Sequence, residues 1–163
     1  MELLNAIEPQ VLALGDSLRA RGWRVASAES CTGGLIAAAC TSVAGSSDWF
    51  ERGFVTYSNE AKVQMLGIDP SLIERHGAVS DEVVRAMLAG ALANAPAQLA
   101  VAVTGIAGPG GAVPGKPVGT VWLAVGTARR ADVQRLQLAG DRAAIRDVTV
   151  IAAVQSLLDA ARV

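Results

Sequence analysis

The sequence is short of histidine and cysteine, and each shortage removes a class of site. His76 is the only histidine, and we expect it in a turn or a capping role between two predicted helices rather than in a histidine-based triad. Cys31 and Cys40 are too few for a disulfide framework, and a single histidine leaves no Cys/His metal cluster. We therefore expect two structural thiols and no metal, with Cys31 kept as a rival nucleophile.

A basic cluster, a secretory leader and a membrane-spanning run are also missing. The formal net charge is -1, so the electrostatic footprint of a nucleic-acid-binding protein is absent and no nucleic-acid partner is expected. Residues 1–7 lack a positive stretch followed by an apolar core and a cleavage site, which predicts a cytoplasmic protein. Residues 86–115 carry no charge, but polar residues and prolines interrupt them, so we expect no membrane contact.

Hydrophobic patterns of helical and extended period alternate along most of the chain. Apolar residues make up 52% of the 163 residues, which predicts one well-buried domain over residues 1–163. We expect helices over 2–21, 35–41, 59–66, from 81 after a Ser80 cap, and over 142–162, and strands over 23–28, 53–57, 99–103, 119–126 and 132–138. These elements predict an α/β fold, a single-domain three-layer α/β/α sandwich with a mixed sheet of about five or six strands.

Small and polar residues gather in three loops that follow predicted strands, at 29–34, 104–110 and 140–142. In open α/β sheets the carboxyl ends of strands form the ligand crevice, so we expect the three loops to converge. Each loop also has a purely structural explanation: helix capping for the first, a flexible connector for the second and an Asp N-cap for the third.

The first of these loops suits an anion. Backbone N–H groups at a helix start, left open by Gly33 and Gly34, can approach a phosphate or carboxylate, and Ser30 and Thr32 add hydroxyl donors. Arg142, in the third loop, offers a two-pronged guanidinium for the same kind of ligand. Neither a Walker loop nor a GxGxxG sequence is present, so no motif supports a nucleoside triphosphate or a dinucleotide.

Lysine is scarce as well, because Lys62 and Lys116 stand against twelve arginines. A desolvated lysine can give up its proton and act as a base, whereas arginine keeps its proton. If Asn59 caps the helix that contains Lys62, the helix dipole and burial both lower the pKa of that lysine, although Glu60 opposes them. The alternative interpretation is a solvated helix residue without a catalytic role.

A neutral lysine needs a nucleophile to activate. Ser47 lies in the connection before the strand that bears Tyr57, and we expect it to pair with Lys62 in attack on an amide or ester carbonyl. Tyr57 would relay a proton or hold the lysine, unless it is only a half-buried strand residue. Glycosidase-type chemistry is unsupported, because the spacing of the acidic residues singles out no pair.

Five segments, taken in order, resemble one family. They are 28–34 (AESCTGG), 45–62 (GSSDWFERGFVTYSNEAK), 76–80 (HGAVS), 105–109 (GIAGP) and 140–142 (GDR). Together they are similar to the CinA C-terminal domain family, the nicotinamide-nucleotide amidases, over nearly the whole chain. The family also occurs fused behind a larger N-terminal domain, for which this chain has no room, so the resemblance is to the stand-alone form.

The resemblance implies hydrolysis of the carboxamide of nicotinamide mononucleotide to nicotinate mononucleotide and ammonia, in bacterial NAD recycling. It implies a small-molecule substrate, no metal or organic cofactor, and a homodimer. Ser47 would be the nucleophile, Lys62 the base and Tyr57 an assistant, with Ser30 as the rival nucleophile. The residues implied to line the substrate site are Glu29, Thr32, Gly33, Gly34, Asn59, Thr104, Gly105, Gly108 and Arg142.

Two other interpretations stay open. One is a non-catalytic nucleotide-binding or regulatory module, linked to competence or DNA damage as the history of the family name suggests. The other is an amidase or esterase that acts on a different small anionic substrate. The loop 110–117 departs from the family pattern, and we expect it to affect substrate access.

Overall fold

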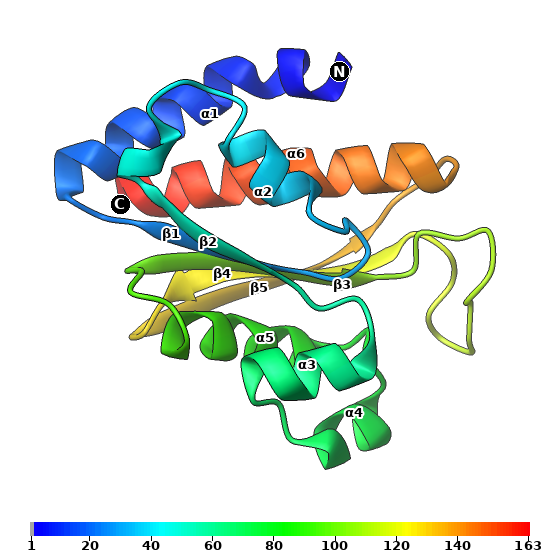
Figure 1. The fold of residues 1–163 in the computed structure, drawn as a ribbon. Helices are drawn as coiled ribbons and strands as arrows, with labels where there is room; N and C mark the ends of the chain where they lie inside the picture. Colours follow the sequence, from blue (N-terminus) through cyan, green and yellow to red (C-terminus); the bar gives the residue numbers. More distant parts are fainter. Residues whose placement is uncertain (1) are drawn as a thin grey trace.

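A computed structural model describes residues 2–163, which form one mixed sheet with helices on both faces (Figure 1). The helices are α1 (Glu2–Arg21), α2 (Leu35–Cys40), α3 (Asn59–Leu66), α4 (Pro70–His76), α5 (Asp81–Ala93) and α6 (Arg142–Arg162), with a short 3-10 turn at Ser46–Asp48. The strands are β1 (Val25–Glu29), β2 (Phe50–Val55), β3 (Leu99–Gly105), β4 (Thr120–Thr127) and β5 (Arg130–Gln137). Their order in the sheet is β2-β1-β3-β4-β5.

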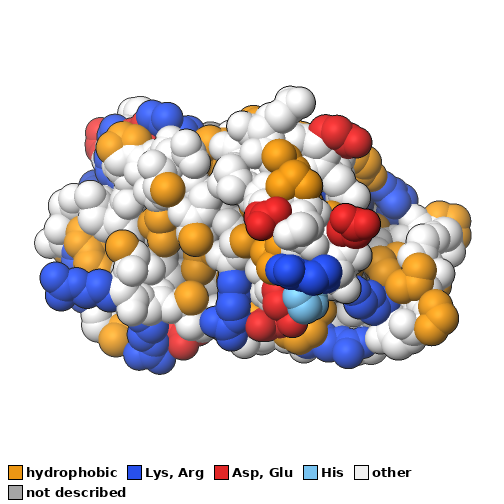
Figure 2. Space-filling view, turned by 90° about the horizontal axis from the view of Figure 1, so that it is seen from below, with side chains coloured by type: hydrophobic (Ala, Val, Ile, Leu, Met, Phe, Trp, Pro, Cys, Tyr) orange, Lys and Arg blue, Asp and Glu red, His pale blue; other side chains and the backbone are white. Residues whose placement is uncertain are grey.

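The helices divide into two layers. Helices α1, α2 and α6 cover one face of the sheet, and α3, α4 and α5 cover the other (Figure 1). This arrangement confirms the predicted three-layer α/β/α fold with a mixed sheet. On the outer side of the α3–α5 layer, acidic and basic side chains lie next to one another without a continuous basic surface (Figure 2). No helix within residues 2–163 combines the length and the apolarity that crossing a bilayer requires.

The two faces of the central strand β3 carry side chains of different size. Leu99, Val101 and Val103 pack into the core on the side of α1 and α6, whereas Ala100 and Ala102 face the core that includes α5. All five side chains are fully buried. Successive side chains of a strand point to opposite faces, so one strand serves two cores. On the α5 side, β3 therefore contributes only small side chains to the core.

Helices α3 and α5 also approach each other closely. A Cβ atom placed on Gly90 of α5 would lie 2.3 Å from the backbone oxygen of Leu66 in α3. Real atoms do not approach to this distance, so glycine is what permits the contact. The α3 helix is thus held tightly against the rest of its layer.

Two elements differ from the sequence-based expectation. Strand β2 begins at Phe50 rather than at residue 53, because its first residues pair with the start of β1. Helix α4 was not predicted, although Asp69 caps it by accepting a hydrogen bond from the Ser71 N–H at 2.9 Å, and Pro70 occupies its first turn. His76 is therefore the last residue of a helix and not part of a turn.

The direction of the strands brings the loops together. Strands β2 and β3 both pair in parallel with β1, so these three strands end at one edge of the sheet, which we call the carboxyl edge, after Glu29, Val55 and Gly105. They begin at the opposite, amino edge. Connections leave β1 and β2 toward opposite faces, so the end of β1 is a topological switch point, where α/β folds commonly bind ligands (Figure 1).

Candidate functional site

Helix α3 delivers Lys62 to the carboxyl edge. The helix is capped by Ser58, whose hydroxyl oxygen accepts a hydrogen bond from the Ala61 N–H at 3.0 Å. The expected cap at Asn59 is therefore wrong by one residue, because the Ser58 side chain reaches the free N–H groups and Asn59 is exposed. Lys62 then stands at the fourth helical position, and its own N–H makes the first regular helical bond, to the Ser58 carbonyl.

The Lys62 amine is enclosed at the end of β1. Only 1% of the residue is exposed, so the solvated alternative does not hold. Its Nζ atom lies 3.2 Å from Ser30 Oγ, 3.0 Å from the Thr56 carbonyl oxygen and 3.5 Å from the Tyr57 carbonyl oxygen. Burial lowers the pKa of the ammonium below its ordinary value of 10.5. Desolvation is thus the main cause of the shift.

Ser30 occupies the first position after β1. Its N–H still donates to the Val103 carbonyl of the neighbouring strand at 3.1 Å, which fixes the backbone of Ser30 against β3. The residue is 9% exposed, whereas Lys62 is 1% exposed, so Ser30 lies nearer to solvent than its partner. A hydroxyl next to a buried amine is the arrangement that serine-lysine chemistry requires.

Ser47 lies at the other edge of the sheet. Its residue precedes β2, and its carbonyl oxygen accepts a hydrogen bond from Arg24 Nη2 at 2.9 Å, just before the start of β1. A strand of the length of β1 or β2 spans roughly 16 Å, which separates Ser47 from Lys62. The predicted pairing of Ser47 with Lys62 is therefore wrong within the chain, because β2 carries the two residues to opposite edges.

The anion site expected at the start of α2 is already filled by a protein carboxylate. Glu29 is fully buried and accepts hydrogen bonds from the N–H groups of Ile36 at 2.8 Å and Ala37 at 3.0 Å. Thr32 is fully buried too, and its hydroxyl donates to Glu29 Oε1 at 2.7 Å. The side chains of Glu29 and Thr32 thus point into the protein and bond to each other, and the predicted substrate contact of these two residues stays a prediction.

Arg142 and Tyr57 meet at the rim of the carboxyl edge. Arg142, the first residue of α6, donates from Nη2 to the Tyr57 hydroxyl at 2.9 Å and from Nη1 to the Gly108 carbonyl at 2.8 Å. Tyr57 is 59% exposed and follows β2, so it is a loop residue rather than a half-buried strand residue. The guanidinium thus joins the segment after β2 to the 104–110 loop, and of the three loops expected to converge it links 104–110 with 140–142.

The glycines and Thr104 shape the wall beside Ser30. A Cβ atom on Gly105 would lie 3.1 Å from Cys31 Sγ and 2.7 Å from a methyl group of Val121, so glycine lets the second loop approach the first. The Thr104 hydroxyl is buried and donates to the Ala78 carbonyl at 2.9 Å. Gly33 and Gly34 form the turn into α2 with φ of 58° and 101°.

The environment of Cys31 disfavours its reactive form. Burial raises the pKa of its thiol to about 11, so the reactive thiolate is scarce at neutral pH. Burial likewise raises the pKa of Cys40 to about 12. No group of three or more His, Cys, Asp or Glu side chains within residues 2–163 is arranged to hold a metal ion.

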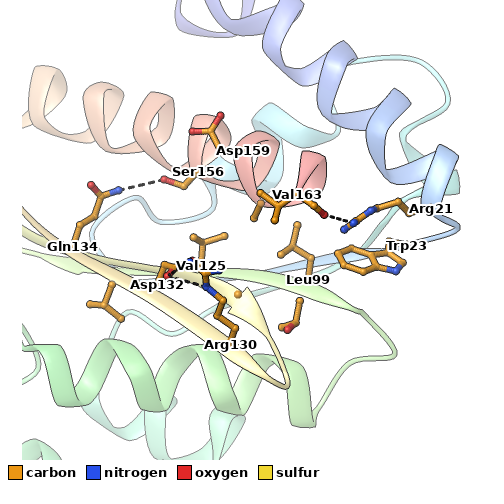
Figure 3. Close-up of a pocket in the computed structure, with 14 residues that line it drawn as sticks. Arg21, Trp23, Leu99, Val125, Arg130, Asp132, Gln134, Ser156, Asp159 and Val163 are labelled. Carbon is orange, nitrogen blue, oxygen red and sulfur yellow. Dashed lines mark hydrogen bonds and ion pairs between the residues drawn. The ribbon is translucent and has the colours of Figure 1, made fainter.

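A cavity of about 500 Å³ lies away from the Ser30–Lys62 pair, between the end of α6, Trp23 and the β4–β5 hairpin (Figure 3). Its arginines are engaged: Arg130 pairs with Asp132 at 3.1 Å, and Arg21 binds the Val163 carbonyl and stacks over Trp23. No lysine lines it. The cavity therefore has no paired nucleophile and base, and the chemistry is concentrated at the carboxyl edge.

Arg146 is a residue of the site region that the sequence-based reasoning missed. It donates from Nε to the Cys31 carbonyl at 3.1 Å and from Nη2 to the Thr32 carbonyl at 3.2 Å. The available signal was its spacing, since Arg146 follows Arg142 by four residues and so shares one side of the same helix. Thr56, whose carbonyl accepts from Lys62, had no such signal.

The comparisons with known proteins agree with this architecture. The nicotinamide-nucleotide amidohydrolase PncC of Pseudomonas putida is 56% identical over 155 residues, covering 95% of this chain and 97% of that protein. The protein of the same name from Escherichia coli K12 is 53% identical over 145 residues, 88% of each chain. The solved structure of the competence damage-inducible protein A from Klebsiella pneumoniae matches with a TM-score of 0.90 and 38% identity, over 93% of this chain and 94% of that one.

The family model for the CinA C-terminal domain matches residues 8–161, which include all six helices at least in part and every strand of the sheet. The resemblance that the five sequence segments indicated is thereby confirmed. On this match and on the identity to its relatives, the chain belongs to the CinA C-terminal domain family.

Proposed function

We propose that the protein is a nicotinamide-nucleotide amidohydrolase that converts nicotinamide mononucleotide to nicotinate mononucleotide and ammonia. The relatives of that name, similar over nearly their whole length, support the substrate. The observation that carries the mechanism is the 3.2 Å contact between Lys62 Nζ and Ser30 Oγ. In this proposal Ser30 is the nucleophile and Lys62 is its general base.

The contacts of Lys62 suit its neutral form. A neutral amine has two hydrogens and one lone pair, and two carbonyl oxygens, of Thr56 and Tyr57, lie within reach of those hydrogens. The lone pair is then free to accept the hydroxyl proton of Ser30. Burial also disfavours the ammonium form of Lys62. The same surroundings therefore favour the neutral amine and orient its lone pair toward Ser30.

The reaction then follows in two halves. Ser30 Oγ attacks the carboxamide carbon while its proton passes to Lys62, and the resulting ammonium returns that proton to the nitrogen as the C–N bond breaks and ammonia leaves. Water attacks the acyl ester with Lys62 again as base. The second half releases the carboxylate product and restores the Ser30 hydroxyl. No metal or organic cofactor takes part in this scheme.

Arg142 is the residue that we propose to hold the phosphate of the mononucleotide. It lies at the rim with Tyr57, and its guanidinium can offer two parallel donors to phosphate oxygens, which a lysine cannot do in the same geometry. Since Glu29 occupies the start of α2, the phosphate has no place there. We propose that the substrate lies between Arg142 and Ser30, with Thr104, Gly105 and Gly108 as backbone wall.

The proposal places this activity in the cytoplasm as a step of pyridine-nucleotide recycling, in a single domain over residues 1–163 that acts as a homodimer without a nucleic-acid partner. Light scattering at micromolar concentration measures the oligomeric state directly. A monomer of full activity would remove the dimer from the proposal and leave the chemistry unchanged.

The test is ammonia release from nicotinamide mononucleotide by the purified protein, combined with intact-mass detection of an acyl adduct on Ser30 after rapid acid quench. We expect stoichiometric ammonia and nicotinate mononucleotide, and the adduct on a peptide that contains Ser30. Tight mononucleotide binding without turnover would instead favour the regulatory module, and turnover only of other amides or esters would favour a different anionic substrate.

A further inference from the structure

Thr32, two residues after Ser30, is held from two directions. Its hydroxyl donates to Glu29 Oε1 at 2.7 Å. Its carbonyl oxygen accepts from Arg146 Nη2 at 3.2 Å, and the preceding Cys31 carbonyl accepts from Arg146 Nε at 3.1 Å. The residue itself is fully buried, so it has no solvent contact that would share these bonds. The segment beside Ser30 is therefore fixed by groups from β1 and from α6.

Glu29 supplies the first direction. Its two carboxylate oxygens accept hydrogen bonds from the Ser27 hydroxyl at 3.3 Å, the Thr32 hydroxyl, and the N–H groups of Ile36 and Ala37. One side chain thus ties the end of β1, the loop and the first turn of α2 together. A buried carboxylate is tolerated only when its oxygens are satisfied in this way.

Arg146 supplies the second direction, from a helix more than a hundred residues away in sequence. Its planar guanidinium binds two successive carbonyl oxygens, which fixes the rotation of both peptide planes. In a trans peptide the C=O and N–H bonds point in opposite directions. With the Cys31 carbonyl directed at Arg146, the N–H of Thr32 is directed away from it.

Within the loop, two turn hydrogen bonds support this conformation, from the Gly33 N–H to the Ser30 carbonyl at 3.0 Å and from the Leu35 N–H to the Thr32 carbonyl at 3.1 Å. Gly33 and Gly34 have positive φ values, and glycine moves between conformations more readily than any other residue. Catalysis by a positioned nucleophile falls steeply when the reacting atoms move by about 1 Å. A loop that carries Ser30 on one side and two glycines on the other therefore needs external support as well.

We propose that Glu29 and Arg146 are positioning residues that clamp Thr32 and thereby hold Ser30 in place for attack. The inference rests on the proposed function in taking Ser30 as the nucleophile. It assigns to Glu29 and Thr32 an indirect role in place of the substrate contact that the sequence suggested. Neither residue touches substrate; they act through the backbone of residues 30–34.

Thr32→Val tests the clamp with the least change of shape, because it removes only the hydroxyl. We expect kcat to fall about 10- to 100-fold with KM nearly unchanged, since the substrate contacts remain. Thr32→Ser, which keeps the hydroxyl, should restore most of kcat. The matched control is Thr149→Val, which removes the bond from another fully buried threonine, to the Ile145 carbonyl at 2.7 Å, within α6.

Thr149→Val should leave kcat unchanged, whatever its effect on the melting temperature. Wild-type kcat in Thr32→Val, or equal loss of kcat in the two valine variants, would overturn the clamp. If the clamp is overturned in this way but Ser30→Ala is inactive, the proposed function remains intact. Full activity of Ser30→Ala would instead overturn the nucleophile on which both ideas depend.

Arg146 has its own readout. Arg146→Ala should lose kcat, and added guanidinium chloride at low millimolar concentration should restore part of it by binding the two free carbonyl oxygens. The control is Arg24→Ala, which removes an arginine bond to the Ser47 carbonyl at the amino edge and should neither lose kcat nor respond to guanidinium. A lost kcat that no guanidinium concentration restores would count against positioning by Arg146.

Discussion

Strands β1 and β2 have one serine at each end of the pair, Ser30 at the carboxyl edge and Ser47 at the amino edge. Of the two, only Ser30 contacts a buried lysine. Ser30 follows β1 and lies 3.2 Å from the Lys62 amine. Ser47 precedes β2, is exposed, and contributes its carbonyl oxygen to Arg24. Ser47 is closer to Lys62 in sequence, at 15 residues against 32. Parallel strands, rather than sequence distance, decide which loops share an edge.

The largest effect should separate the two serines. Ser30→Ala is expected to lower kcat/KM for nicotinamide mononucleotide by about 10³-fold or more, because no other hydroxyl within residues 2–163 forms a hydrogen bond with Lys62. Ser47→Ala should stay within about twofold of the wild type, as for most surface changes away from a site. Steady-state ammonia release measures both. A large loss in Ser47→Ala with little loss in Ser30→Ala would mean that Ser47 acts in a site that the fold of one chain does not form.

The two lysines offer the next comparison. Lys62→Met removes the base and should lower kcat by about 10² to 10⁴-fold, the usual contribution of general base catalysis. Lys116→Met removes an exposed-loop contact, from Nζ to the His76 carbonyl at 2.7 Å, and should keep kcat within a few-fold of the wild type. Circular dichroism confirms that both variants fold. Near-normal turnover by Lys62→Met would exclude it as the base.

The pKa of Lys62 sharpens the same comparison through pH. Because burial lowers this pKa below 10.5, kcat/KM should rise about tenfold per pH unit up to the lowered value and then level off, with a midpoint below 10.5. A pH-rate profile measures the midpoint. A profile still rising near pH 10.5 would show that the amine is not desolvated.

The free energy of unfolding should also depend on pH through the titration of Lys62. Between the lowered folded pKa and 10.5 the unfolded chain binds more protons than the folded one, so the free energy of unfolding rises with pH across this window. The stability that neutral Lys62 contributes is lost as the pH falls through the pKa that this residue has in the folded protein. Urea unfolding at a series of pH values should show this slope in the wild type and a smaller one in Lys62→Met.

Arg142→Lys should have a smaller effect, expressed mainly in binding. A lysine keeps the charge but cannot form two parallel bonds, so we expect KM for the mononucleotide to rise about tenfold with a smaller change in kcat. Nicotinamide riboside, which lacks the phosphate, should be turned over about equally by the wild type and by Arg142→Lys. An equal KM increase for the riboside would argue against phosphate recognition by Arg142.

The smallest effect is expected at the amino edge. Arg24→Met removes the bonds to the Ser47 carbonyl and to the Glu51 carboxylate, both near the surface. Turnover should stay within about twofold of the wild type, because nothing at this edge contacts Ser30 or Lys62. A strong loss of turnover in a folded Arg24→Met protein would show that the two edges are coupled.

The sequence predicted the layers and the convergence of the loops, because both depend on local pattern and on the geometry of parallel strands. Leu99 to Val103 was recognisable as a central strand by its continuous apolar character. Strand β2 was placed too late because Glu51 and Arg52 interrupt its apolar pattern at an edge strand. Helix α4 has only seven residues, too few for a clear helical period.

The site was predicted in composition but not in orientation. Lys62, Arg142 and Tyr57 were found by residue type, and the structure brings them to the same edge. Whether a polar side chain in a loop turns toward solvent or inward depends on tertiary partners, as Glu29 and Thr32 show. Sequence pattern contains no information on that choice when both outcomes satisfy the same polar atoms.

The small side chains of Ala100 and Ala102 on one face of β3 affect how far the Lys62 side chain has to reach. They are what β3 contributes to the α5 side of the core, and the Gly90 contact holds α3 close to α5. The Lys62 side chain, which has four methylene groups, then reaches from α3 to Ser30 at the end of β1 and is buried along the way. We expect larger residues at these alanines to move the helix outward and to leave the Lys62 amine short of Ser30, so that the size of core side chains would set the distance between these two groups.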